Sequence, residues 1–527
     1  MTRSPHRALS IRDVVLAILD QLAPATASTH EDRGNLLHFG LTCKFIWELV
    51  EPRLWYTLTN EAIYCILPED IQVSFDDRSL NDVSGTVWAS GMRSLDEKEL
   101  NSLMRYCGHA RELCLWEASG IIPRRRRGFR HSLAALPQLH SKIQALQSLQ
   151  HIILSNHRSC NVDLFAQSLV PLLGPQLRSI GLGLDGLKHG PSALFTSIAE
   201  QCSGLLVFSL DGMDMNRDVS GICKTLCNTV WRSCTSLKTI EVEAIDSSQE
   251  LWTVLASLPD LEHLRLMFEL SINVLQVSKP YGSQAFRSLR ELTGPHEMLD
   301  EPEMTDTSSV VVAIDSPFMD KLEFTCPTGE KLCETISIIV DRWSSTIREL
   351  GLWTSWHEGA ENSLTPRELL GRLYPLSRLE RLAIHGLHLL DLEDHDIDHL
   401  VRAWPNLTRL ELRVDDETLD PAVGVSLLSR RSIHTLAKAY PNLRSLAISI
   451  DHSLPYDQPP QDELVPTCPG VQLWQSVISN LDDIPATVAF MRRYFPNIRL
   501  FYGASTEMDR RLITGILGTT IDEHFNF

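Results

Sequence analysis

Two histidines in an acidic segment come nearest, among the residues of this chain, to a metal site. His395 and His399 stand four residues apart within Asp391–His399, so on a helix both would lie on one face. Zinc accepts imidazole and carboxylate ligands, but it needs further ligands at a suitable spacing, and none follows here. We therefore interpret the segment as the solvent face of a helix whose acidic residues gather near its start, where the helix dipole favours negative charge. The sequence predicts no metal site.

A run of arginines interrupts an otherwise acidic chain. Arg124, Arg125, Arg126 and Arg127 are consecutive, and Arg130 follows shortly after. Three interpretations stay open, namely a nuclear-import signal, a contact for a phosphate group and an exposed loop. Because the run is isolated in an acidic chain, the exposed loop is favoured over either of the others.

No motif that would carry out catalysis is recognisable in the chain. It contains no G-x-S-x-G, no phosphate-cradling G-x-x-x-x-G-K, no H-E-x-x-H and no dinucleotide glycine fingerprint after a strand. Each of these motifs holds a nucleophile, a phosphate, a metal or a cofactor where its reaction needs it. We therefore predict a protein that is not an enzyme and uses no cofactor.

Composition restricts the partners and the compartment. The chain has 527 residues and a formal net charge of −19, which argues against a general nucleic-acid binder, because such a protein needs basic surface. The longest apolar stretches, such as Ile336–Val340, are far shorter than a bilayer-spanning helix. The 12 cysteines include no paired C-x-x-C sets and are typical of reduced core thiols. These features predict a cytoplasmic or nuclear protein with neither a membrane nor a nucleic acid as partner.

One short phrase recurs between residues 110 and 501. It consists of an apolar residue, two variable residues, an apolar residue, one variable residue and a last apolar residue, and it follows a helix-like stretch that often ends in a proline turn such as Trp404-Pro405-Asn406. Successive copies start 24 to 36 residues apart, and such a period is typical of leucine-rich repeats. The pattern predicts an α/β solenoid of helix-plus-strand units, with an all-helical solenoid as the alternative. The copies with all three apolar positions begin at Leu149, Leu177, Leu205, Leu237, Leu261, Met319, Ile347, Leu379, Leu407 and Leu443.

Strand alternation predicts which residues would contact a partner. The apolar positions of each phrase point into the core, so the residues between them line the opposite, concave face. Toward the C-terminal half this face would gather a cationic and aromatic patch, suited to an acidic or phosphorylated peptide. The alternative is that Glu349 and Glu411 pair with these arginines and leave a neutral ladder. The predicted client-binding residues are Arg265, Trp353, Arg381, His385, Arg409 and Arg413.

The first sixty residues carry a second pattern. Ser10–Leu22 places apolar residues at helical spacing, and after a polar, proline-containing break the chain reads Asn35-Leu36-Leu37-His38-Phe39-Gly40-Leu41-Thr42-Cys43-Lys44, followed by Pro52-Arg53-Leu54-Trp55. This order resembles an F-box, a small three-helix module. The usual Leu-Pro before the first helix is replaced by Leu9-Ser10.

The resemblance implies a role for the first segment. F-boxes dock on the Skp adaptor of cullin-based ubiquitin ligases, and leucine-rich repeats that follow an F-box bind the protein to be ubiquitylated. The chain would then be the substrate-recognition subunit of an SCF-type (Skp–cullin–F-box) ligase, with the adaptor, cullin through it, and an unidentified client as partners. The motif positions, each either adaptor-facing or core, are Ile11, Val14, Ile18, Leu19, Leu41, Cys43, Leu54 and Trp55.

A second function stays open, and it implies the same division of the chain into domains as the first. The N-terminal helices could serve only as a cap for a ligase-independent, protein-binding scaffold, because a solenoid needs its first apolar face covered. The plan is a helical module in 1–60, a junction in 61–108, irregular repeats in 109–505 and a cap or tail in 506–527. A capping box at Ser94–Glu97 would open a helix through Tyr106 in the junction. Polar, proline-bearing insertions are expected at 294–309 and 452–470.

Overall fold

Two compact units, Met1–Ala244 and Ile245–Phe527, divide the chain. The structure, a computed structural model, describes residues 12–22, 30–59, 62, 95–116, 148–155, 169–183, 192–211, 219–242, 249–266, 285–294, 308–326, 330–354, 364–387, 392–414, 428–448, 450, 466–471, 473–475, 489–490, 492–497 and 500–502.

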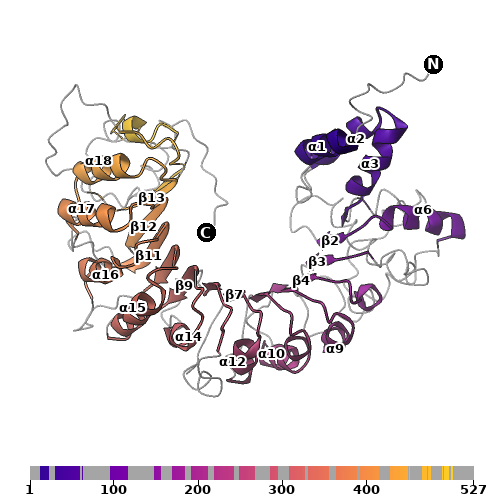
Figure 1. The fold of residues 1–527 in the computed structure, drawn as a ribbon, viewed down its shortest axis with the longest axis horizontal. Coiled ribbons are helices and arrows are strands. Elements are labelled where there is room, and N and C mark those ends of the chain that lie inside the picture. The colour runs from indigo at the N-terminus through magenta and orange to yellow at the C-terminus, as the bar shows by residue number, and fades with distance from the viewer. Residues whose placement is uncertain are drawn as a thin grey trace, which may run out of the picture. The chain divides into compact units, whose positions relative to one another are not determined.

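The first unit begins with helices and continues as a parallel sheet. Strands β1 to β6 pair in chain order, each parallel to the next, and the later helices lie along the sheet (Figure 1). The helices are α1 (Arg12–Leu22), α2 (His30–Gly40), α3 (Lys44–Leu54), α6 (Glu97–Cys107), η3 (Val170–Leu172), α9 (Ser192–Gln201), α10 (Val219–Asn228) and α11 (Val230–Ser233). The strands are β1 (Thr57–Thr59), β2 (Glu112–Trp116), β3 (His151–Ser155), β4 (Ser179–Gly183), β5 (Val207–Asp211) and β6 (Thr239–Val242).

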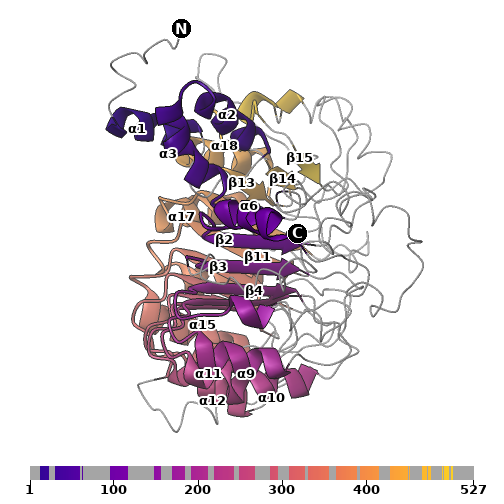
Figure 2. The same cartoon turned by 90° about the vertical axis from the view of Figure 1, so that its right-hand side faces the viewer.

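The second unit repeats the same arrangement. Its strands β7 to β15 also pair in chain order and in parallel, with α14 to α18 on one side of the sheet (Figures 1 and 2). The helices are α12 (Gln249–Ser257), α14 (Ser308–Ala313), α15 (Glu330–Trp343), α16 (Pro366–Leu373), α17 (Asp394–Ala403) and α18 (Arg430–Ala439). The strands are β7 (His263–Leu266), β8 (Glu291–Thr293), β9 (Lys321–Thr325), β10 (Glu349–Trp353), β11 (Arg381–Leu387), β12 (Arg409–Val414), β13 (Ser445–Ala447), β14 (Leu473–Gln475) and β15 (Leu500–Tyr502).

Most strands form where the apolar phrase predicts one. In β10, Leu350 and Leu352 are buried, and they stand level with Leu322 and Phe324 of β9 on the neighbouring strand. Equivalent positions therefore stack from unit to unit and form a continuous core, in which each fully buried leucine contributes about 1.5–3 kcal/mol. The parallel strand-and-helix solenoid is confirmed, and the all-helical alternative is wrong.

The helices pack one face on the sheet and end where the sequence predicts. In α15 the buried residues Leu332, Ile336, Ile339 and Trp343 recur every three or four positions, as a helix with one apolar face requires. Helix α17 ends at Ala403, just before the buried Trp404 and the proline that cannot continue it.

The predicted core thiols lie between the helices and the strands. Burial raises the pKa of Cys202 and Cys468 to about 11, so both keep their protons at neutral pH. The Sγ atom of Cys468 donates a hydrogen bond to the carbonyl oxygen of Tyr440 in the preceding repeat, over 3.1 Å. These thiols act as small buried groups that join one repeat to the next.

Three details of the domain plan need correction. The N-terminal helices run directly into β1, which pairs with β2, so the sheet starts inside the segment assigned to the helical module. Strand β14 was not predicted, because Trp474 occupies a position that is aliphatic in most other copies. Helix α6 begins at Glu97, and the capping box is formed by Asp96 and Glu99, each accepting the other's backbone N–H at 2.8 Å.

Other parts of the plan lie wholly or partly outside the described residues. Ser94, the arginines at 124–127 and 130, and the segment 506–527 are outside, as is most of each insertion at 294–309 and 452–470.

Candidate functional site

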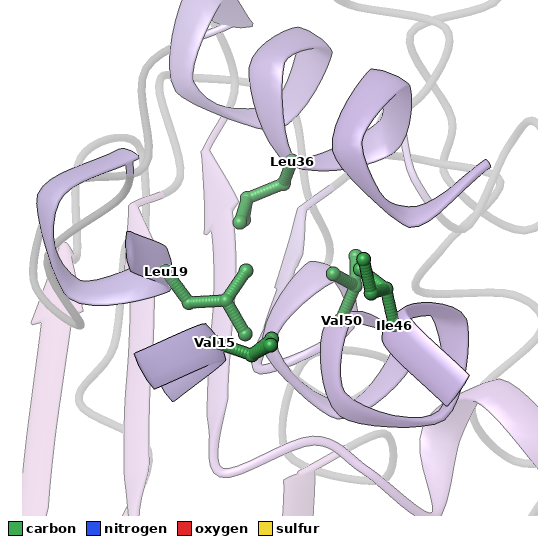
Figure 3. Close-up of a cluster of buried hydrophobic side chains, with 5 residues drawn as sticks. All are labelled: Val15, Leu19, Leu36, Ile46 and Val50. Atoms are coloured by element: carbon green, nitrogen blue, oxygen red, sulfur yellow. The ribbon is translucent and has the colours of Figure 1, made fainter. Parts of the chain in front are cut away.

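The three N-terminal helices form a small bundle with its own core. Val15 and Leu19 of α1, Leu36 of α2, and Ile46 and Val50 of α3 are at most 3% exposed and converge between the helices (Figure 3). In α1 and α3 such burial follows from the sequence, because the two buried residues of each helix stand four positions apart on one face. The helical part predicted for the first sixty residues is therefore present.

Some apolar side chains of this bundle remain on its surface. Leu41 is 68% exposed, Val14 40% and Leu37 39%. Leu37 and Leu41 are four residues apart, and the backbone N–H of Leu41 donates to the Leu37 carbonyl over 3.0 Å, so both side chains lie on one side of the end of α2. Together they form a small apolar pair on the surface of the bundle.

The predicted adaptor-binding residues separate into distinct groups. Val14 and Leu41 are exposed, and Ile18 is half-buried. Leu19 is fully buried in the bundle core, so of the two roles left open for it the structure shows packing and not a surface contact. Cys43 and Leu54 pack partly buried against the same core. Ile11 lies outside the described residues.

Trp55 joins the bundle to the first repeat. Its ring lies 4.5 Å from that of Tyr106 on α6, and an Nη atom of Arg105 on α6 donates a hydrogen bond to the carboxylate of Glu51 on α3 over 2.8 Å. These contacts place the end of α3 against the stack. Trp55 thus packs between the bundle and α6. Leu37 is an exposed apolar residue that the sequence analysis did not name. The signal for Leu37 was present, since a single buried stripe on α2 does not accommodate Leu36, Leu37 and Phe39 together.

The strand face of the second unit brings together most of the predicted client-binding residues. The rings of Trp353 on β10 and His385 on β11 stack with centroids 5.0 Å apart and planes 19° apart. A Cβ atom built on Gly351 would lie 2.8 Å from the Trp353 ring, so the absence of a side chain there lets the indole lie back across the sheet. Trp353 is only 8% exposed and is a framework residue more than a surface contact.

Glu411 on β12 is a fully buried carboxylate at the centre of this face. It accepts from the Nε atom of Arg409 over 2.6 Å and from an Nη atom of Arg413 over 3.0 Å, and from the Ser445 hydroxyl over 2.9 Å. Burial opposes its ionisation most strongly, but the Arg409 hydrogen bond and the charges of Arg413, Arg409 and His385 together hold the pKa of Glu411 below its ordinary value. The predicted pairing of these arginines with glutamates is therefore present in part, because Arg409 and Arg413 share Glu411 within one strand and only Arg381 pairs with a glutamate, Glu349, on a neighbouring strand.

The two remaining predicted residues, Arg381 and Arg265, form no ion pair with Glu411. Arg381 on β11 pairs with Glu349 on β10 over 3.4 Å and keeps a 49% exposed side chain. Arg265 is exposed on β7, and the strands β8 and β9 separate it from β10. Arg265 is thus not part of the group formed by the other five.

A bulge in β11 sets the position of His385. The register with β12 shifts between Ile384 and Leu387, and Gly386 has φ of +76°, a backbone conformation that favours glycine. A Cβ atom at Gly386 would overlap the carbonyl oxygen of Thr354. The bulge gives β11 an extra residue next to His385, which stands level with Trp353 of β10.

Replacing Gly386 with alanine is expected to lower the free energy of unfolding by at least about 2 kcal/mol, because both the positive φ and the overlap with Thr354 must be relieved. Urea denaturation measures the change. Gly371→Ala is the matched control, since nothing lies within 4 Å of a Cβ there and alanine favours the helix that contains it. Equal stability of the two variants would contradict the role assigned to Gly386.

The acidic segment around His395 and His399 forms the start of α17, as predicted. Both histidines are exposed, and the Nδ1 atom of His395 lies 3.1 Å from Glu393. Within the part of the chain that the structure describes, no group of three His, Cys, Asp or Glu residues could hold a metal ion.

Asp394 has a structural role that the spacing did not reveal. Its carboxylate accepts hydrogen bonds from the backbone N–H of Ser429 over 2.9 Å, from the Ser429 hydroxyl over 2.6 Å and from the Ser432 hydroxyl over 2.5 Å. A carboxylate of α17 therefore caps the start of α18 in the next repeat.

Asp394→Ala is expected to lower the free energy of unfolding by about 1–2 kcal/mol through loss of this cap. Asp398→Ala on the same helix is the control, because its pair with Arg431 over 3.5 Å lies at the surface and contributes about 0–1 kcal/mol. Thermal unfolding of both variants distinguishes them, and a larger loss for Asp398→Ala would contradict the capping role.

No helix among the described residues has the length and apolar content needed to cross a bilayer. Comparison with models of known protein families gives no match, and comparison with curated proteins gives none. Among solved structures, the chain is similar to the crystal structure of the Rad7 and Elc1 complex in yeast, at 14% sequence identity and a TM-score of 0.40, over 71% of this chain and 85% of that one. The architecture rests on the strand pairing and helix packing described above, not on this distant likeness.

Proposed function

We propose that this protein is a non-catalytic substrate-recognition subunit of an SCF-type ubiquitin ligase. The observation that carries the proposal is a three-helix bundle, at the F-box-like segment, that keeps Val14, Leu37 and Leu41 on its surface. We take these exposed apolar side chains as the part of the bundle that the partner would cover. The repeats that follow provide an open sheet face for a client. In this proposal the Skp adaptor binds the bundle and brings cullin to the client.

A second candidate function has its own supporting observation. The contacts of Trp55 with Tyr106 and of Glu51 with Arg105 attach α3 to the first repeat, which is what a cap for the stack must do. A scaffold without any ligase would use the bundle only in this way. The two functions differ in whether a partner binds the exposed apolar residues of the bundle.

Co-precipitation with cullin tests the proposal. Full-length protein is immobilised and incubated with purified cullin, with and without purified Skp adaptor. Under the proposed function, cullin is retained only when the adaptor is present, because the adaptor is the bridge between them. A scaffold would retain cullin in neither case, and that result would favour the second candidate.

A further inference from the structure

Side chains of alternating charge begin strands β8 to β11 of the second unit, and a histidine begins β7. The first residues of β7 to β11 are His263, Glu291, Lys321, Glu349 and Arg381, and each stands level with the next on the neighbouring strand. His263 lies 3.1 Å from Glu291, and Arg381 lies 3.4 Å from Glu349. Opposite charges side by side stabilise a sheet, whereas like charges directly opposite destabilise it.

The residues just before these strands alternate in the opposite phase. The row reads Glu262, Arg290, Asp320, Arg348 and Glu380. Arg348 lies 3.4 Å from Asp320 and 3.8 Å from Glu380, and Arg290 lies 3.9 Å from Glu262. Two adjacent rows therefore form a pattern in which a charged group has neighbours of opposite sign.

The pattern breaks at β12. Its first residue is Arg409, which stands level with Arg381 of β11 on one side and with Ser445 of β13 on the other, and the residue before it is the uncharged Thr408. Two arginines therefore occupy neighbouring strands at the same level, and backbones at this position are about 4.8 Å apart. Two like charges therefore lie side by side here, whereas neighbouring strands from β8 to β11 begin with residues of opposite charge.

The two guanidinium groups turn to different carboxylates. Arg381 uses Nη1 to reach Glu349, and Arg409 uses Nε to reach Glu411. Their side chains remain 49% and 39% exposed, and among the described residues no carboxylate bridges the pair. A guanidinium has five N–H donors, so each group retains donors for a further oxygen. Including Arg413, three arginines share two glutamates, in a chain whose net charge is −19.

We propose that Arg381 and Arg409 together bind one anionic side chain, a carboxylate or a phosphate, of an extended client segment. Charge complementarity selects this ligand, because an oxygen anion between the two guanidinium groups would supply the negative charge that the alternating row lacks at β12. The inference rests on the proposed function, in which the sheet face receives the client.

Peptide pools with one fixed central position test the inference. The fixed residue is Glu, phosphoserine, Ser or Lys, the flanking positions are degenerate, and binding of fluorescently labelled full-length protein is measured. Loss of one charge-assisted contact lowers affinity by about tenfold. We expect about tenfold greater binding to the Glu pool, the phosphoserine pool or both than to the Ser pool. Preference for phosphoserine alone would identify phosphate as the source, and an equal preference would show that a carboxylate suffices.

Matched variants locate the effect. Arg381→Gln with Arg409→Gln should remove the preference for the anionic pools, whereas Arg265→Gln with Arg444→Gln removes the same charge from exposed arginines of this unit outside the pair and should retain it. Arg381→Lys with Arg409→Lys keeps the charge and the fold, and should keep a reduced preference, because lysine cannot make the bidentate contact. Equal binding to all pools, or an unchanged preference in the glutamine or lysine pair, would overturn the inference.

Parallel binding of the Skp adaptor separates this inference from the proposed function. If the protein binds the adaptor but shows no preference for anionic peptides, this inference is overturned and the proposed function is not. Anion preference without adaptor binding overturns the ligase assignment but leaves the arginine pair as a binding site.

Discussion

Replacing Leu37 and Leu41 together with aspartate is expected to weaken binding of the Skp adaptor by at least about a hundredfold, because two exposed apolar contacts are exchanged for charges at the centre of the proposed surface. Neither side chain contributes to the buried core of the bundle, since they are 39% and 68% exposed. The free energy of unfolding should therefore stay within about 0.5 kcal/mol of the parent protein. Isothermal titration calorimetry measures the affinity, and circular dichroism checks the fold.

Two controls give this prediction its specificity. Phe318→Asp introduces the same kind of change at an apolar residue that is 54% exposed in the second unit, and it should leave adaptor binding unchanged. Leu19→Asp places a charge in the bundle core, and should lose binding together with the helical signal of the bundle. If the Leu37 and Leu41 variant binds the adaptor as tightly as the Phe318 variant, this surface is not the docking site.

Removing the carboxylate of Glu411 should be the most destabilising single change on the sheet face. Glu411→Ala leaves Arg409, Arg413 and Ser445 without their shared acceptor. Breaking one side of a buried charged network costs about 3–5 kcal/mol, and exposure of the arginine side chains places this case near the lower end, at about 3 kcal/mol. Urea denaturation measures the change.

Glu323→Ala provides the comparison for Glu411. Glu323 occupies the equivalent position on β9 and lies 3.1 Å from Lys321, with a side chain that is 21% exposed. Its removal should lower the free energy of unfolding by less than about 1 kcal/mol. A Glu411 variant as stable as the Glu323 variant would show that the buried carboxylate is not needed by its arginines.

Lowering the pH should remove the stability that ionised Glu411 gives to the folded protein. The pKa of Glu411 in the folded protein lies below its ordinary value, so the folded state favours the ionised form. The resulting stability is fully present above the pKa of the unfolded chain and is lost as pH falls through the lower pKa of the folded state. The free energy of unfolding of Glu411→Ala should thus depend less on pH below about 4.5 than that of the parent protein.

Spacing of apolar residues was sufficient to predict most of the fold. Phrases such as Leu350-Gly351-Leu352 specify a strand with one buried face, and their period specifies how strands stack. Positions that depart from the phrase escaped prediction for physical reasons. Trp474 fills an aliphatic position in β14, and only two residues separate β1 from the helix before it, fewer than separate any other described helix from the strand after it.

The sequence predicted most of the residues in the candidate sites, but not how their side chains are arranged. Alternation placed Trp353, Arg381, His385, Arg409 and Arg413 on one face, and the structure brings them together. Alternation does not specify rotamers, so the stacking of Trp353 over Gly351 and the depth of Glu411 required coordinates. In the bundle, the motif positions left open which residues face outward, and the structure places Val14 and Leu41 on the surface and Leu19 in the core.

Titration of the purified full-length protein with the Skp adaptor tests the central claim most directly. The ligase-receptor account predicts a one-to-one complex with a Kd of about 1 µM or below, equivalent to about 8 kcal/mol. The complex should be lost in the Leu37→Asp and Leu41→Asp variant and retained in Phe318→Asp. A folded parent protein that gives no binding at tens of micromolar adaptor would contradict the account and leave the N-terminal bundle as a cap.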